Sequence, residues 1–181
     1  MLVVLLAFPA FGQVASRDFE ADDSDCMTYV TTFDGSDTSY SVVAWINLET
    51  LPTNAQPFWV GSSGDSSDIY FSLNIISAGT EARCTVRDDA ENTQTVSGST
   101  SVSVDGLWHI FACTRNGNSV TSYYDSSSDN DSAVSIGSMS VNIARIGCRA
   151  PLAAESLFFD GELAHLQIFD VELTAEQGFC C

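Results

Sequence analysis

Two β-prone runs between residues 107 and 124 are joined by Asn116-Gly117. The first run, LWHIFACTR, is mostly apolar, and the second, VTSYY, follows shortly after the glycine. Asn and Gly both tolerate the positive φ that a tight primed turn requires. Asn-Gly between two such runs is among the strongest short hairpin signals, so we expect an antiparallel hairpin here.

The rest of the chain from Val14 onward reads as short β-runs separated by Gly, Asp, Asn and Ser clusters, with no helical period before the last residues. Residues 40–48 are apolar on both faces, which is typical of a strand covered on two sides. Residues 125–132 are expected to form a polar loop tip, and Leu173 to Gln177 one helical turn with Thr174 as its N-cap. We predict one all-β domain over residues 14–177, an antiparallel β-sandwich or jelly roll.

The strongly negative net charge of the chain disfavours some classes of binding partner. It has 24 acidic residues against 6 basic ones, a formal net charge of −18, and every basic residue is Arg. Such a field repels nucleic acid and disfavours anionic membranes. Negative charge either only keeps the protein soluble or lets acidic loops collect divalent cations.

Residues 1–13 begin with the apolar run MLVVLLAFPAF, which is too short to span a bilayer. It is either the apolar region of a signal peptide cut before Gln13, or an N-terminal arm that docks on a neighbouring subunit or particle. We therefore expect an extracellular, secreted protein or one on a virion surface. Residues 178–181 form a cysteine-containing tail.

Seven short sequence strings along the chain form recognisable motifs. They are Arg17–Asp23, Tyr40–Ile46, the Trp108-His109 hairpin, Tyr124-Asp125, Ala144–Gly147, Phe159–Phe169 and Leu173–Gln177. In this order they resemble the motifs of laminin-G-like, concanavalin A-like lectin and glucanase sandwich domains. The resemblance implies the same sandwich, and it is stronger for fold than for function.

The resemblance implies a non-catalytic recognition or adhesion module that presents loops to a glycan or a protein. The alternative is a structural or decoration subunit of a virion or extracellular filament. Candidate loops are residues 62–68, 88–92, 125–132 and 150–155. Their candidate ligand-binding carboxylates are Asp65, Asp68, Asp88, Asp89, Asp125, Asp129 and Asp131.

Members of the family that hold calcium draw on an Asp in the final strand, where this chain has Ala164. Asp22, Asp23 and Asp160 are the remaining candidates for a Ca²⁺ site. The competing interpretation is that these Asp residues cap turns.

The six cysteines form no C-x-x-C pair. Cys84, Cys113 and Cys148 lie in β-runs, where we expect small buried apolar residues. First and last strands lie side by side in sandwiches of this kind, so Cys26, Cys180 and Cys181 are the disulfide candidates, with their pairing left open.

Catalytic motifs are missing from the sequence. The nearest string to the E-h-D-h-x-E of glucanases is Glu20–Asp25, which ends in Asp and has polar spacers, and there is no G-x-S-x-G. We predict that the protein is not an enzyme, and that His109 hydrogen-bonds a backbone carbonyl rather than a ligand. Asn130 heads the one glycosylation sequon.

Overall fold

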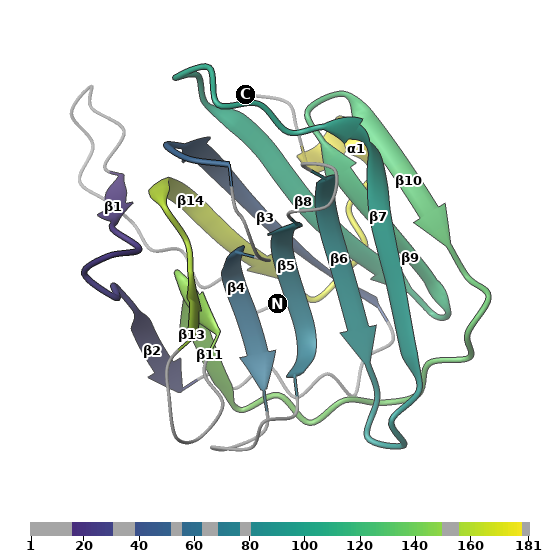
Figure 1. Ribbon diagram of the computed structural model, residues 1–181. Coiled ribbons are helices and arrows are strands. Elements are labelled where there is room, and N and C mark those ends of the chain that lie inside the picture. Colours follow the sequence, from purple (N-terminus) through teal and green to yellow (C-terminus); the bar gives the residue numbers. More distant parts are fainter. Residues whose placement is uncertain are drawn as a thin grey trace.

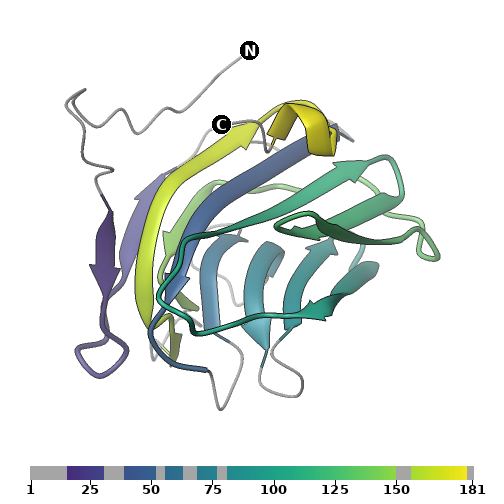
Figure 2. The ribbon, with the colours of Figure 1, turned by 90° about the horizontal axis from the view of Figure 1, so that it is seen from above.

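The computed structural model describes residues 16–30, 39–51, 56–62, 69–76, 81–149 and 156–178. This part of the chain forms two six-stranded antiparallel sheets, a two-stranded sheet and one short helix, α1 (Ala175–Gly178). Figures 1 and 2 show the two large sheets stacked face to face. The predicted all-β antiparallel sandwich is confirmed. The predicted N-terminal arm, residues 1–13, lies outside the described residues.

The two large sheets are called sheet A and sheet B, and their strands follow in spatial order. Sheet A contains β1 (Arg17–Phe19), β14 (Gly161–Phe169), β3 (Ser39–Leu48), β8 (His109–Asn116), β9 (Ser119–Tyr124) and β10 (Ser127–Asp131). Sheet B contains β2 (Met27–Val30), β11 (Ile143–Ile146), β4 (Gln56–Ser62), β5 (Ile69–Ile76), β6 (Glu81–Arg87) and β7 (Thr93–Ser101). The small sheet, β12 (Cys148–Arg149) with β13 (Ser156–Phe158), packs against β4.

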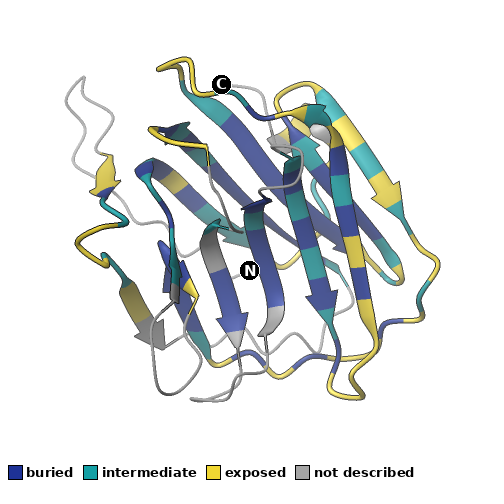
Figure 3. Ribbon diagram, viewed as in Figure 1, coloured by how far each residue is buried: buried dark blue, intermediate teal, exposed yellow. Residues whose placement is uncertain are grey.

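The main core lies between the sheets and follows from strand alternation. In β6, Ala82, Cys84 and Val86 are fully buried and point inward, and the residues between them are half-buried. Figure 3 shows this as alternating buried and intermediate bands along β6. Because successive side chains of a strand point to opposite faces, Arg83 and Thr85 lie on the outer face of sheet B.

The central strand β3 is covered on both faces, as predicted. Its inner side chains join the main core, and Val43 joins Ile110 and Ala112 of β8 in a second buried cluster on the outer face of sheet A. Leu173, from the segment before α1, packs onto this cluster. The outer face of sheet A is therefore partly covered by the chain itself.

The predicted hairpin is confirmed, with its turn one residue further on. Asn116 pairs with Ser119, so Gly117 and Asn118 form the turn, and Gly117 has a φ of 59°. Glycine with positive φ at the first central position is typical of a type II′ turn.

The expectation of a loop at residues 125–132 is wrong over most of that range, because Ser127 to Asp131 form strand β10. Backbone pairing with β9 overrides the low β-propensity of this polar sequence.

Two disulfides correct the interpretation of the cysteines. Cys84 of β6 is bonded to Cys113 of β8, across the core between the two sheets. Cys26 is bonded to Cys148, so Cys26 does take part in a disulfide. The expectation that Cys84, Cys113 and Cys148 are free buried thiols is wrong, because all three are bonded. Cys180 and Cys181 lie outside the described residues. Disulfides persist in oxidising compartments, which indicates an extracellular or secreted protein.

The predicted C-terminal turn is also confirmed. Helix α1 starts after Thr174, whose backbone amide donates a hydrogen bond to the side chain of Gln177 at 3.2 Å, as in a capping box. Across the described residues, no helix has the length and apolar character needed to cross a membrane.

Candidate functional site

Most carboxylates predicted to contact a ligand from the loops bond to the protein itself. Asp65 and Asp68 lie outside the described residues. Asp89 and Asp129 each accept hydrogen bonds from the backbone amide and the hydroxyl of one serine, Ser140 and Ser99 respectively. The Asp129 contacts tie the edge strands of the two sheets, β10 and β7, together. Ligand binding by these carboxylates stays a prediction.

Asp88 is the most enclosed of this set, with 2% of its surface exposed. It accepts hydrogen bonds from the backbone amides of Ala90, Asn92 and Gly137 and from the side-chain amide of Asn92, at 2.7–2.9 Å. Burial opposes its ionisation, but these hydrogen bonds outweigh burial and lower its pKa. Asp88 therefore fastens the loop after β6 to the 136–140 segment.

Asp131 and Asn130 of β10 are also engaged. Asp131 accepts a hydrogen bond from the backbone amide of Ala133. The side-chain amide nitrogen of Asn130 donates to Ser119, Val120 and Thr121 of β9. Glycosylation of Asn130 stays a prediction. In the folded chain, the side-chain nitrogen that would carry the glycan already donates hydrogen bonds to β9.

His109, at the start of β8, lies between two carboxylates. Its Nδ1 is 2.8 Å from Asp125 and its Nε2 is 3.1 Å from Asp105, while the ring stacks on Tyr124. Burial opposes protonation, but the hydrogen bonds to Asp125 and Asp105 raise the pKa of His109. Only the imidazolium donates from both nitrogens. The predicted backbone-carbonyl partner is therefore wrong, since both nitrogens face carboxylates.

Ser103, His109 and Asp125 superficially resemble a hydrolase triad, with the Ser103 hydroxyl oxygen 3.4 Å from His109 Nε2. Asp105 lies closer to the same nitrogen, at 3.1 Å, and also accepts a hydrogen bond from the Ser103 hydroxyl. A general base needs an unprotonated nitrogen facing the nucleophile. This arrangement favours a charged imidazolium, so it braces the loop before β8 rather than activating Ser103.

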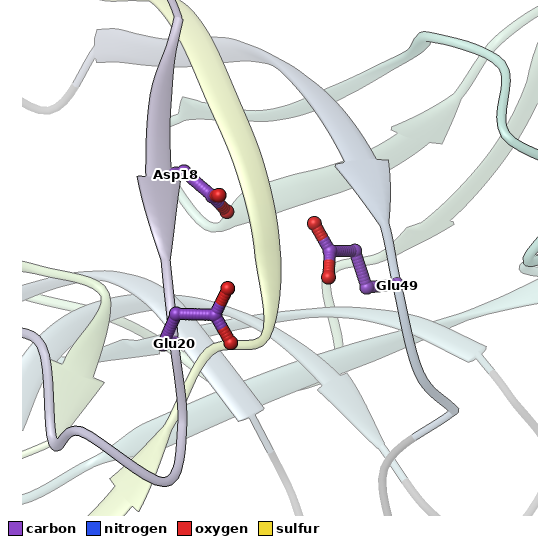
Figure 4. Close-up of side chains that lie close together, drawn as sticks. All are labelled: Asp18, Glu20 and Glu49. Atoms are coloured by element: carbon purple, nitrogen blue, oxygen red, sulfur yellow. The ribbon is translucent and has the colours of Figure 1, made fainter.

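An acidic corner is formed by Asp18, Glu20 and Glu49 at the β1 edge of sheet A. Their carboxylate oxygens all lie within 4.8 Å of one another, and Figure 4 shows the three side chains directed toward one another. Oxygen ligands of this type suit a hard cation such as Ca²⁺. Exposed acidic groups also gather without an ion, so this grouping by itself does not establish a cation site.

Like-charge repulsion marks the acidic corner electrostatically. The charge of Asp18, followed by burial and the charge of Glu49, raises the pKa of Glu20. Burial, followed by the charges of Asp18 and Asp160, raises the pKa of Glu49. Neighbouring negative charges therefore make ionisation of Glu20 and of Glu49 less favourable.

The carboxylates gathered here are not those predicted for calcium. Asp22, Asp23 and Asp160 are all described, but they do not form such a group. Asp160 instead accepts hydrogen bonds from the Ala21 backbone amide and the Thr50 hydroxyl, both far away in the sequence. A Ca²⁺ site at Asp22, Asp23 and Asp160 stays a prediction.

The outer face of sheet B carries a different set of groups. We call the outward side chains of its strands β5, β6 and β7 the polar face. They include Ser72, Asn74, Arg83, Thr85, Thr95 and Ser97. The inward neighbours of these residues fill the core, so the polar side chains stand on rigid, fully paired strands.

Arg83 stands at the centre of the polar face, paired across the strands with Asn74 on one side and Ser97 on the other. We call these three residues the Arg83 row. Arg83 Nε donates to the Ser97 hydroxyl at 3.2 Å, and the Asn74 amide nitrogen donates to Ser72 at 2.9 Å. Within the described residues, the two terminal amino groups of Arg83 and the amide oxygen of Asn74 have no partner. The row therefore offers donors and an acceptor side by side.

The family model described as Concanavalin A-like lectin/glucanases superfamily (Laminin_G_3) matches residues 22–177. The chain belongs to this family. The resemblance stated from the sequence motifs is thereby confirmed. The family description covers both lectins and glucanases, so membership alone does not decide between binding and catalysis.

Solved structures with this fold include a carbohydrate-binding module, the CBM40 of the Ruminococcus gnavus IT-sialidase bound to α2,3-sialyllactose. It has a TM-score of 0.66 and 14% identity, over 93% of this chain and 98% of that chain. A heptameric SAP-like pentraxin from Limulus polyphemus has a TM-score of 0.61 and 15% identity, over 80% of this chain and 69% of its own. Identities this low show the fold alone. Among curated proteins, none matches the sequence significantly.

A third solved structure is botulinum neurotoxin type C, reported as entering cells through interaction with two ganglioside molecules. It has a TM-score of 0.58 and 15% identity, over 77% of this chain and 34% of the toxin chain.

Sequence reasoning missed the Arg83 row because it looked for function in loops. The alternating string Arg83-Cys84-Thr85-Val86-Arg87 signals a strand with one apolar and one polar face. That pattern could have pointed to an outward arginine. Its pairing with Asn74 and Ser97 depends on the register of three strands, which the string does not contain.

Proposed function

We propose that this chain is a non-catalytic recognition module that binds a glycan on the polar face of sheet B. The observation that carries the proposal is the Arg83 row. Sugar hydroxyls both donate and accept hydrogen bonds, and planar Arg and Asn side chains on a rigid sheet meet both needs. The row is half-buried, so a ligand would contact it across a surface rather than inside a deep pocket.

The comparisons support binding to sugars in a sandwich of this kind. A module with this fold was solved with sialyllactose, and a toxin with this fold depends on gangliosides for cell entry. Secretion, which the two disulfides indicate, would expose the module to extracellular glycans. The proposed surface differs from the loops predicted from sequence.

The position and exposure of the acidic corner favour binding over catalysis. Glycoside hydrolysis needs two carboxylates flanking a bound sugar. The grouped carboxylates, Asp18, Glu20 and Glu49, belong to the edge of sheet A, whereas the Arg83 row is on sheet B. The pKa of Glu20 is raised mainly by the charge of Asp18 rather than by an enclosing site.

The alternative of a virion or filament subunit depended on residues 1–13 as an arm in subunit contacts. Those residues lie outside the described ones, so this hypothesis stays a prediction and no contact of the described sandwich favours it.

A glycan array followed by calorimetric titration of the ligands it identifies tests the proposal. Asn74→Ala should weaken binding about five- to tenfold, because one hydrogen bond to a ligand contributes about 1–1.4 kcal/mol. Gln167→Ala, on the outer face of sheet A, is the matched control and should leave affinity unchanged. Absence of binding to every glycan at millimolar concentration would refute the proposal, as would loss of binding in Gln167→Ala alone.

A further inference from the structure

Arg83 differs from the other arginines in what it contacts. Arg87, on the same strand, lies 3.1 Å from Glu91, and Arg17 lies 3.9 Å from Asp25. Arg83 makes one hydrogen bond within the described residues, to a neutral serine hydroxyl, although the chain contains 24 acidic residues. A half-buried guanidinium therefore has terminal amino groups that no residue in the described part of the chain contacts.

The other three arginines lie in different surroundings from Arg83. Arg115 is fully buried and donates to the backbone carbonyls of residues 117, 136 and 137. Arg145 is 8% exposed. Arg149 is exposed in the two-residue strand β12, away from the strands of the Arg83 row. Among the described arginines, Arg83 alone combines a central position on the polar face with an unpaired charge.

The fold does not require a positive charge at this position. Arg83 points away from the core, and a half-buried polar group without its hydrogen bonds has a desolvation cost. A ligand that accepts from both terminal amino groups would remove that cost. The planar fork of a guanidinium matches a carboxylate, which accepts two parallel hydrogen bonds.

We infer that the glycan bound by the polar face carries a carboxylate, as sialic acids and uronic acids do, and that this carboxylate pairs with Arg83. Asn74 and Ser97 then contact the neighbouring hydroxyls. The net charge of −18 opposes an anionic ligand at long range. At physiological ionic strength that repulsion is screened beyond about 8 Å, whereas direct pairing with Arg83 is not. The inference rests on the proposed glycan-binding function of the same face.

The test titrates the whole chain with four probes: 3′-sialyllactose, its methyl ester, lactose and digalacturonic acid. The methyl ester keeps the shape of sialyllactose and removes the charge. We expect a probe with a free carboxylate to bind at least about tenfold more tightly than the ester and lactose, since charge-assisted hydrogen bonds contribute about 1.5–3 kcal/mol. The sialic acid and uronic acid arms distinguish the two sources of the carboxylate.

Arg83→Gln should remove that preference, so that 3′-sialyllactose binds no more tightly than its methyl ester. Arg17→Gln makes the same change in net charge on sheet A and should keep the preference. An unchanged melting temperature shows that each variant is folded.

Equal affinities of the charged and uncharged probes in the native chain would overturn the inference while leaving the proposed function intact. A carboxylate preference that persists in Arg83→Gln would overturn it as well. No binding of any probe, together with a negative glycan array, would overturn both.

Discussion

The two outer faces of the sandwich differ in how much of their surface the fold itself uses. On sheet A, Val43, Ile110 and Ala112 form a buried apolar cluster that Leu173 helps to cover. On sheet B, the Arg83 row faces outward with donors and an acceptor that no described residue satisfies. A face that packs a segment of its own chain serves stability, and a face with unused hydrogen-bonding groups is available to a ligand.

The largest expected loss of stability comes from removing the disulfide that joins the two sheets across the core. Replacing both Cys84 and Cys113 by Ala should lower the free energy of unfolding by about 3–5 kcal/mol, because the bond closes a loop across the core. Urea unfolding measures the loss. An unchanged free energy of unfolding would contradict the account.

Asp88 follows strand β6 of sheet B, and we expect its role there to be structural rather than ligand-binding. Asp88→Ala leaves three backbone amides without their acceptor and should cost about 2–3 kcal/mol of stability. Because hydrogen bonds lower the pKa of Asp88 in the folded state, its contribution is present above the unfolded pKa and is lost as pH falls through the folded pKa. The difference between native and variant unfolding should therefore shrink in acid. An unchanged stability would contradict this role.

Leu173 tests the covered face of sheet A. Leu173→Ala should cost about 1–2 kcal/mol, less than the 2–5 kcal/mol typical of a fully buried leucine, since Leu173 is half-buried. Glycan affinity should stay the same in titrations of the folded variant. Lost affinity with unchanged stability would place the binding surface on sheet A instead.

The acidic corner gives the smallest effect. Glu20→Gln should slightly raise the melting temperature at pH 7, because it removes repulsion from Asp18 and Glu49. The folded protein binds this proton more tightly than the unfolded chain, so native stability rises as pH falls through the window between the two pKa values. The gain from the variant should vanish near pH 4, about where an unperturbed Glu protonates. Destabilisation at pH 7 in buffer containing a chelator would contradict this account.

Features set by local pattern could be predicted, because they depend on neighbouring residues only. The hairpin around Gly117 and the doubly covered β3 are of this kind. Strand β10 was missed because its polar sequence pairs with β9 through backbone groups that composition does not report. The Cys84–Cys113 bond depends on which strands of stacked sheets face each other, so strand pattern alone suggested free thiols.

The site was harder to predict than the fold, because a carboxylate's role depends on distant partners. Asp88 was a ligand candidate from its loop position, but its acceptor role depends on Gly137, 49 residues away. Alternation alone places Arg83 on an outer face. That no carboxylate of the described residues pairs with Arg83 becomes visible only when the register of β5, β6 and β7 is known.

The most direct test of the central claim is to map a bound glycan onto the two faces by NMR. Amide signals of ¹⁵N-labelled protein would be followed during titration with 3′-sialyllactose, or with another ligand identified by the glycan array. The account predicts shifts concentrated at Asn74, Arg83 and Ser97, with no change at Val43, Ala112 and Leu173. Shifts confined to the sheet A residues would contradict it.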